Sequence, residues 1–347
     1  MSETAAATAI MPEPVGRRPP PAPYEGSAAE RIAKRYVERH WQGETYYDRN
    51  VVKPSPFSWV VWVYIFVGGL SGSAAILAAL ADLFGDEESK SIVSRGRHIA
   101  AIGSAIGAPL LIADLHTPQR FFNMLRIYRA TSPMSIGSWI LTGFGAGAVA
   151  TAGADLLGWR AIARVMQVPT ALLGAGMSVY TAALLSATST PFWAAMPRLL
   201  AARFGSSAMA SAAAALSLAE RIDGNDAGAR KLDRIAAVAT AAELAVTMAT
   251  PGRLRAVGLE RPVRQDKWAM IDRFGAAGLG VVVPLGCYAV ARLGRKQNRT
   301  LGVAAALGIL AGGLLMRMSI MYAGQDSARS AQDYFRFTER PRRERGG

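Results

Sequence analysis

The feature that most constrains this chain is a series of eight long apolar stretches separated by short polar connections. Each is about 18–25 residues long, which suits a helix that crosses a hydrocarbon core of about 30 Å. Lipid offers no partners for backbone N–H and C=O groups, so such stretches must be helical. The sequence predicts an all-α fold, a polytopic membrane helical bundle, with spans near 58–82, 98–115, 136–157, 167–187, 199–219, 232–250, 271–291 and 300–322.

The segments outside the spans differ in composition from the bundle. Residues 1–57 are polar and Pro-rich and then charged, which predicts an N-terminal extension with a short interfacial helix. Residues 58–322 form the predicted transmembrane bundle, and residues 323–347 form a basic tail. Small residues recur within the spans, which favours close helix packing in lipid.

Basic residues indicate the orientation of the chain. Lys and Arg number 39 against 25 Asp and Glu. In a soluble protein this excess would suggest a nucleic-acid partner, but here it indicates basic loops next to membrane lipid. Lys and Arg are about twice as frequent on the side that carries both termini, which predicts that both termini are cytoplasmic.

The chain has few residues that could hold a redox metal. A single cysteine, Cys287, excludes a disulfide framework and a Cys-ligated iron–sulfur cluster within this chain. The histidines are His40, His98 and His116, and no two of them are placed to face each other across the bilayer as haem ligands. We therefore expect no metal site, haem or iron–sulfur cluster in this chain.

The charged residues inside the predicted spans include two that lie away from the span ends. Glu243 is near the middle of its span, and Arg317 interrupts the last one. An ionised group there costs about 2.5–3.5 kcal/mol on insertion scales, so each is expected to face the bundle interior. Both are candidates for a proton relay, although Arg317 could instead snorkel to the interface. Asp82 and Asp155 end their spans and are expected to be solvated.

The connection "DLHTPQRFFNMLRIYRATSPMSIGSWIL" (residues 114–141) is unusually rich in charged, aromatic and hydroxyl-bearing side chains. Its charged and aromatic middle is typical of an interfacial amphipathic helix, but this does not explain Asp114 and His116 at its start. Ser132 before Pro133 predicts a capped start of the third span. Three basic residues of this connection are named the connection arginines below: Arg120, Arg126 and Arg129.

Several motifs in this order resemble the NrfD/polysulfide-reductase type of membrane subunit. They are "TYYDRNVVKPSPFSW", "YIFVGGLSGSAAIL", "DLHTPQRF" with "NML" and "TSPMSIGSWIL", "YTAALLSATSTPFW", and "GGLLMRMSIMYAGQDS". Together they extend from about residue 45 to 328. His116 and Thr117 stand where Gly-Arg is usual in the family, Gln119 replaces an acid, and Ala182 replaces a glycine close to Tyr180.

The resemblance implies a quinone site in a bundle formed by the first four spans. Tyr180 matches the family position for a hydrogen bond to a quinone carbonyl. Asp114 and His116 would be the acid and base nearby, since histidine titrates near neutral pH. Further side chains expected to line the pocket are Ser135, Trp139 and Tyr64. For Tyr64, packing in the core is the favoured expectation. The connection arginines would dock a partner subunit, and Arg120 could instead hold Asp114.

The resemblance also implies a function within a complex. Such a subunit is not catalytic alone and exchanges electrons between a ferredoxin-like iron–sulfur subunit and membrane quinone or quinol. A molybdopterin catalytic subunit, for example one of the formate dehydrogenase type, would complete a respiratory oxidoreductase in the bacterial inner (cytoplasmic) membrane. Coupling to proton movement stays open. The alternatives are an ion or solute transporter that uses Glu243 and Arg317, and a passive anchor without quinone chemistry.

Overall fold

The computed structural model describes residues 52–115, 117–259, 267–293 and 299–338. The chain divides into a unit of residues Met1–Asp48 and a unit of residues Arg49–Gly347. The first unit, which includes the predicted interfacial helix, lies outside the described residues, as do His116 and the tail after Thr338.

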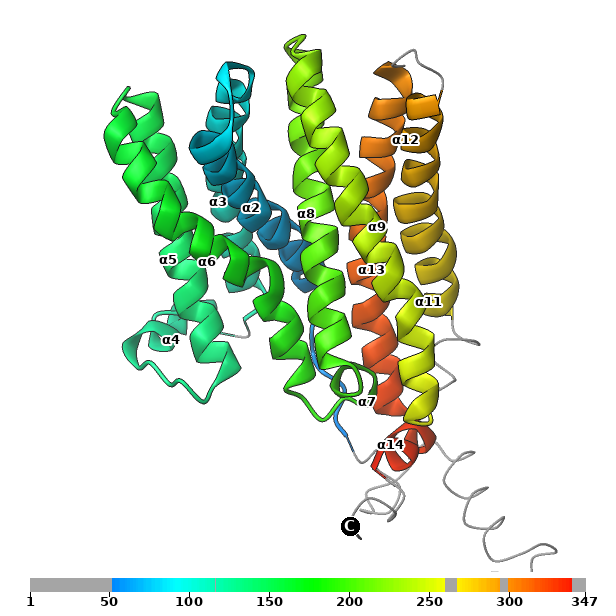
Figure 1. The fold of residues 1–347 in the computed structure, drawn as a ribbon. Coiled ribbons are helices and arrows are strands. Elements are labelled where there is room, and N and C mark those ends of the chain that lie inside the picture. Colours follow the sequence, from blue (N-terminus) through cyan, green and yellow to red (C-terminus); the bar gives the residue numbers. More distant parts are fainter. Residues whose placement is uncertain (1–51, 116, 260–266, 294–298, 339–347) are drawn as a thin grey trace, which may run out of the picture. The chain divides into compact units, whose positions relative to one another are not determined.

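Eight helices within the described ranges are long and apolar enough to cross a membrane, which confirms the predicted fold class. Figure 1 shows them running side by side. Most begin or end beyond the predicted spans because charged residues continue them past the apolar stretches. In chain order they are α2 (Trp59–Phe84), α3 (Lys90–Ala113), α5 (Pro133–Leu156), α6 (Arg160–Ser186), α8 (Pro197–Ile222), α9 (Asp226–Ala256), the segment Lys267–Leu293, and α13 (Arg299–Arg329).

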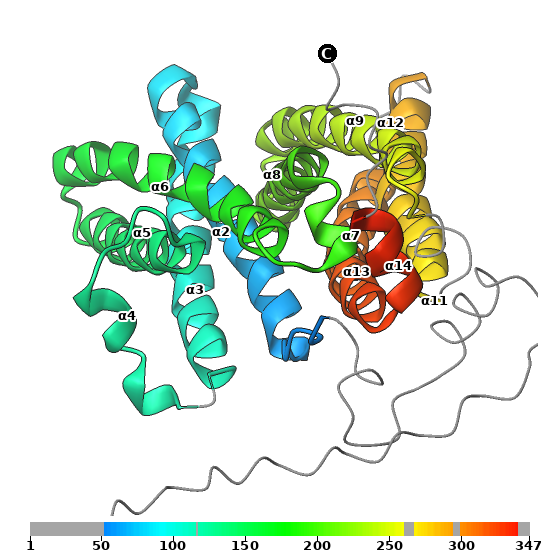
Figure 2. The ribbon, with the colours of Figure 1, turned by 90° about the horizontal axis from the view of Figure 1, so that it is seen from below.

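The first four long helices pack together as one bundle, named the N-terminal bundle here. Helix α2 contacts α3 and α6, and α5 contacts the same two helices (Figures 1 and 2). The closest approach is between α2 and α6, where a Cβ on Gly72 would lie 2.3 Å from the carbonyl oxygen of Gly174. Only glycine fits there, as expected where helices associate closely in lipid.

The remaining long helices form the C-terminal bundle. Helix α8 packs on α9, and α13 packs on α8 and on the segment Lys267–Leu293. That segment begins as α11 (Lys267–Met270), continues as the π-helix η4 (Ile271–Val282) and ends as α12 (Val283–Leu293). Wider π turns are rare and are often found at functional sites. Helices α8 and α13 also contact α2, so the two bundles share an interface.

Short elements and turns connect the long helices or follow the last of them. They are η2 (Glu87–Ser89), η3 (Pro118–Arg120), α4 (Asn123–Arg126), α7 (Pro191–Ala194) and α14 (Ala331–Thr338). The predicted cap of α5 is confirmed, because the Ser132 hydroxyl accepts a hydrogen bond from the Ser135 N–H at 3.4 Å. Gly158 and Gly224 have φ of 75° and 78°, in the left-handed region that ends a helix in a tight turn.

These turns define two sides of the bundle. We name the side at which α2 begins and α13 ends the proximal side, which also carries the 114–132 connection. The other is the distal side, at which Gly158 and Gly224 turn the chain.

Candidate functional site

Two tyrosines from different helices meet inside the N-terminal bundle. The hydroxyl of Tyr64 on α2 and that of Tyr180 on α6 are hydrogen-bonded to each other. Tyr64 is only 2% exposed, whereas Tyr180 is half-buried. The structure therefore brings two of the predicted pocket residues together. The expectation that Tyr64 is a core residue is also met, but its hydroxyl carries a polar contact that packing alone does not require.

Glycines make room for this tyrosine pair. A Cβ on Gly137 of α5 would lie 2.4 Å from Cε2 of Tyr180. A Cβ on Gly107 of α3 would be 3.5 Å from Cδ2 of Tyr64, in ordinary contact. The pair is thus surrounded by all four helices of the N-terminal bundle, and the position of the Tyr180 ring depends on Gly137.

Asp114 ends α3 on the proximal side. Its Oδ1 accepts hydrogen bonds from the Ser58 hydroxyl and, at 3.4 Å, from the Ser58 backbone N–H. Ser58 immediately precedes α2, so the carboxylate ties the start of that helix to the end of α3. Asp114 therefore has a structural contact besides its predicted chemical function.

Ser135 and Trp139 are held by the connection that precedes α5. The Ser135 hydroxyl accepts from the Arg129 N–H at 3.0 Å and donates to the Ile127 carbonyl at 3.3 Å. Trp139 is 43% exposed and packs edge-on against Tyr128, with ring centroids 6.4 Å apart. These contacts hold both side chains against the connection.

The connection arginines are all exposed on the proximal side. Arg120 ends η3, Arg126 ends α4, and Arg129 follows before α5 begins. His116 lies outside the described residues, so its predicted function as acid or base stays a prediction.

A second polar cluster lies on the distal half of the same bundle and corrects one expectation. Asp155 accepts from Arg97 Nη1 at 2.6 Å and from the Ser94 hydroxyl at 2.6 Å. Asp82 accepts from Arg164 at 2.9 and 3.0 Å and also from Gln167. The expectation of solvated span ends is wrong for both acids, since neighbouring helices bring cations onto them.

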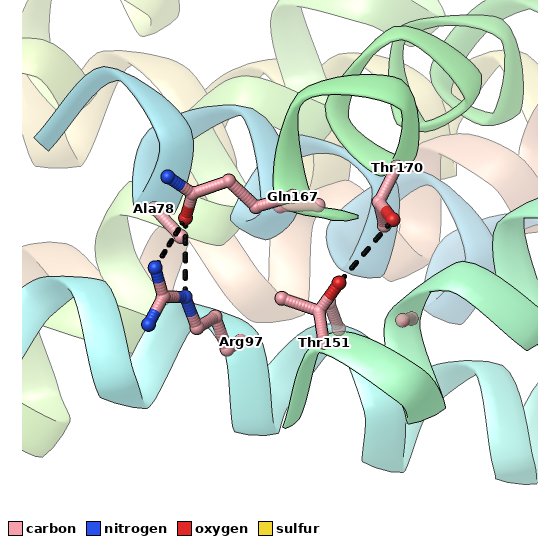
Figure 3. Close-up of a pocket in the computed structure, with 8 residues that line it drawn as sticks. Ala78, Arg97, Thr151, Gln167 and Thr170 are labelled. Carbon is pink, nitrogen blue, oxygen red and sulfur yellow. Dashed lines mark hydrogen bonds between the residues drawn. The ribbon is translucent and has the colours of Figure 1, made fainter. Parts of the chain in front are cut away.

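Arg97 is at the centre of this distal cluster and is only 6% exposed. Its guanidinium donates to the Gln167 amide oxygen from Nε at 3.1 Å and from Nη2 at 2.7 Å (Figure 3). Thr151 and Thr170, whose hydroxyl oxygens are 3.4 Å apart, line the same space. The space measures about 10 Å³, about enough for one water molecule, so the contacts of this cluster join helices rather than line a ligand-sized cavity.

The C-terminal bundle contains the buried charges that the sequence places at membrane depth. Glu243 and Arg317 are 4% and 1% exposed and interact electrostatically, so snorkelling is wrong for Arg317. The Arg317 guanidinium lies over the rings of Phe66 and Phe204, at 5.3 and 5.6 Å, and donates to the Gly313 carbonyl at 2.8 Å.

Sequence reasoning missed another ion pair in this bundle. Arg203 Nη2 lies 2.7 Å from Asp272 Oδ1, and the same guanidinium interacts electrostatically with Glu243. The sequence features that could have indicated this pair are Arg203, within the fifth apolar stretch, and Asp272, just inside the seventh. Among the described residues, no group of three or more His, Cys, Asp or Glu is placed to hold a metal ion.

Two comparisons with known proteins both indicate similarity to polysulfide reductase proteins. The sequence profile of the family described as "Polysulphide reductase, NrfD" matches residues 49–327. The sequence is also 27% identical over 300 residues to the C subunit of the polysulfide reductase of Wolinella succinogenes. That alignment covers 77% of this protein and 93% of the relative.

Proposed function

Since the chain belongs to the polysulphide reductase NrfD family, we propose that it is the quinone-reactive membrane subunit of a multi-subunit oxidoreductase. In this proposal the chain is not catalytic alone. It exchanges electrons between a ferredoxin-like iron–sulfur subunit and membrane quinone or quinol. A molybdopterin subunit, for which a formate dehydrogenase type is one candidate, would act on the other substrate.

The observation that carries this proposal is the hydroxyl pair of Tyr64 and Tyr180. In such a pair one O–H donates to the other oxygen, and the second O–H is left to donate elsewhere. A quinone carbonyl is an acceptor that this free O–H would satisfy. Because Tyr180 is half-buried, a quinone head would approach the pair from the side of Tyr180. The site therefore suits a ligand whose oxygen needs one buried donor.

Quinone reduction takes up two protons with two electrons, so the site needs groups that pass protons. The Tyr180 hydroxyl would hold the carbonyl oxygen that becomes protonated. Asp114, on the proximal side of the same bundle, and His116 are the titratable groups proposed to exchange protons with it. Asp114 would do so while anchored by Ser58.

The proximal side is the proposed docking face for the iron–sulfur subunit. The connection arginines give it positive charge, which would attract an acidic partner surface and speed association. We propose that this side faces the cytoplasm, on the basis of the excess of Lys and Arg there. The membrane would then be the bacterial inner membrane.

The proposal is tested by quinol oxidation in the purified complex with Tyr180→Phe and Tyr64→Phe. Each substitution removes one hydroxyl and keeps the ring, so packing beside Gly137 is preserved. Loss of one buried hydrogen bond, about 1 kcal/mol, predicts a roughly five- to tenfold lower rate. Tyr322→Phe is the matched control, because that ring stacks on Trp268 in the C-terminal bundle, with centroids 4.4 Å apart.

Equal rates in all four proteins would remove the tyrosine pair from the reaction. A complex that contains the chain but reacts with no quinone would support the passive anchor. Solute flux through liposomes that hold this chain alone, independent of quinone, would support the transporter.

A further inference from the structure

A cavity opens into the proximal half of the C-terminal bundle, away from the tyrosine pair. It measures about 140 Å³ and lies between α8, α9, α13 and the π-helix η4. Its outer part includes the exposed Arg273 and the partly exposed Trp268, and its inner part includes Arg203, Thr247 and Ser319. One water needs on the order of 10–15 Å³ of such space, so several waters fit.

The inner end of this cavity has polar atoms that lack protein partners. Arg203 is 5% exposed, and its Nε has no hydrogen-bond partner within the described part of the chain. The same holds for the hydroxyl oxygen of Thr247. Buried donors of this kind cost free energy unless they are hydrogen-bonded, so the inner end of the cavity, where these polar atoms lie, is expected to hold water.

The hydrated end lies next to Glu243. Helix α9 places Glu243, Thr247 and Thr250 on one face, since residues four and seven positions apart lie above one another. Thr247 and Thr250 line the cavity, and Glu243 is one turn deeper. Around Glu243 are two cations and one acid from the other elements of the bundle: Arg203 on α8, Arg317 on α13 and Asp272 on η4.

The distal continuation of the same path is tightly packed. On α9 the next turns present Thr240 and Ala236, both 0% exposed. The Thr240 hydroxyl also has no hydrogen-bond partner within the described residues, but unlike Thr247 it does not line the cavity. On the facing elements, a Cβ on Gly312 of α13 would lie 2.1 Å from Cα of Gly280 in η4, so these two backbones are in contact. Small buried residues of α8 complete this layer: Ala212, Ala213 and Ala214.

From this asymmetry we infer that Glu243 is a proton-binding site that opens to the proximal side only. A proton from the proximal solvent passes along water in the cavity to the Glu243 carboxylate, which becomes a carboxyl group, and it leaves by the same path. The neighbouring Arg203 and Arg317 balance the carboxylate when the proton leaves. The inference concerns the C-terminal bundle and does not depend on quinone chemistry.

The test is cysteine accessibility in membrane vesicles that contain the whole complex. Cys287→Ser removes the one native thiol of this chain. Thr247→Cys places a thiol in the cavity. Thr240→Cys is its matched control, two turns away on the same face of α9. A small cationic methanethiosulfonate reagent is added to vesicles of either orientation, which are calibrated by Thr131→Cys on the proximal side and Glu87→Cys on the distal side.

We expect Thr247→Cys to react only when the proximal side is exposed to the reagent, and Thr240→Cys to react from neither side. A second thiol in the cavity, from Ala277→Cys, should behave as Thr247→Cys does. Both cavity thiols inert from both sides would overturn the inference, because the cavity would then be dry. Reaction of Thr240→Cys from the distal side would overturn it as well, because the path would then cross the bundle. None of these outcomes alters the quinone proposal.

Discussion

Replacing Arg97 with glutamine should destabilise the N-terminal bundle strongly. The guanidinium holds Asp155 at 2.6 Å and makes two bonds to the Gln167 oxygen, while it is only 6% exposed. Removing one partner of a buried ion pair costs about 3–5 kcal/mol. Asp155 keeps the Ser94 hydroxyl at 2.6 Å, so the lower end of that range, about 3 kcal/mol, is expected.

The assay is equilibrium unfolding of the purified protein in mixed micelles with increasing SDS. Arg160→Gln is the control, since Arg160 is exposed and such surface changes usually cost less than about 0.5 kcal/mol. Adding Asp155→Asn to Arg97→Gln should recover part of the free energy of unfolding that Arg97→Gln loses, because no unpaired carboxylate then remains at that position. A loss no larger than that of Arg160→Gln would refute the reasoning. So would a double variant whose loss equals the sum of the two single losses.

Three further predictions concern other parts of the chain. Gly137→Ala should lower quinol oxidation at least as much as Tyr180→Phe, since its Cβ would lie 2.4 Å from the Tyr180 ring; a rate equal to wild type would show that the ring position is unimportant. Changing all three connection arginines to glutamate should weaken binding of the iron–sulfur subunit by about tenfold or more at low salt and less at high salt, measured by co-purification; unchanged recovery would move the docking face elsewhere. The Lys231 ammonium is hydrogen-bonded to the Asp86 carboxyl and lowers its pKa. This contact should therefore stabilise the fold at neutral pH and be lost on acidification, as Asp86 is protonated. In Lys231→Gln, the free energy of unfolding should depend less on pH in the acidic range.

The spans were predictable because length and hydropathy alone decide whether a segment can cross a bilayer. The cap at Ser132 was predictable for a local reason, since one side chain and the next proline determine it. Tyr180 was found through a motif that resembles a known family. Its partner Tyr64, 116 positions away, was named only as a pocket wall, because no local pattern reports which helix faces another.

The errors and omissions have the same physical origin. Asp82 and Asp155 end apolar stretches, and each alone suggests a solvated helix end. Arg97 binds Asp155 and Arg164 binds Asp82 only because α3 and α6 extend past the apolar stretches and pack beside the other two helices. The π-helix η4 has no distinct composition, so the position of Asp272 opposite Arg203 could not be predicted.

The proposed function depends most on quinone binding beside the tyrosine pair in the N-terminal bundle. The most direct measurement is photolabelling of the complex with an azidoquinone, followed by mass spectrometry of its peptides. We expect label on segments of α2, α5 or α6 near Tyr64, Gly137 and Tyr180, with competition by unlabelled quinone and a loss of label in Tyr180→Phe. Label confined to the C-terminal bundle, or label at the tyrosine pair that unlabelled quinone does not displace, would contradict quinone binding at this site.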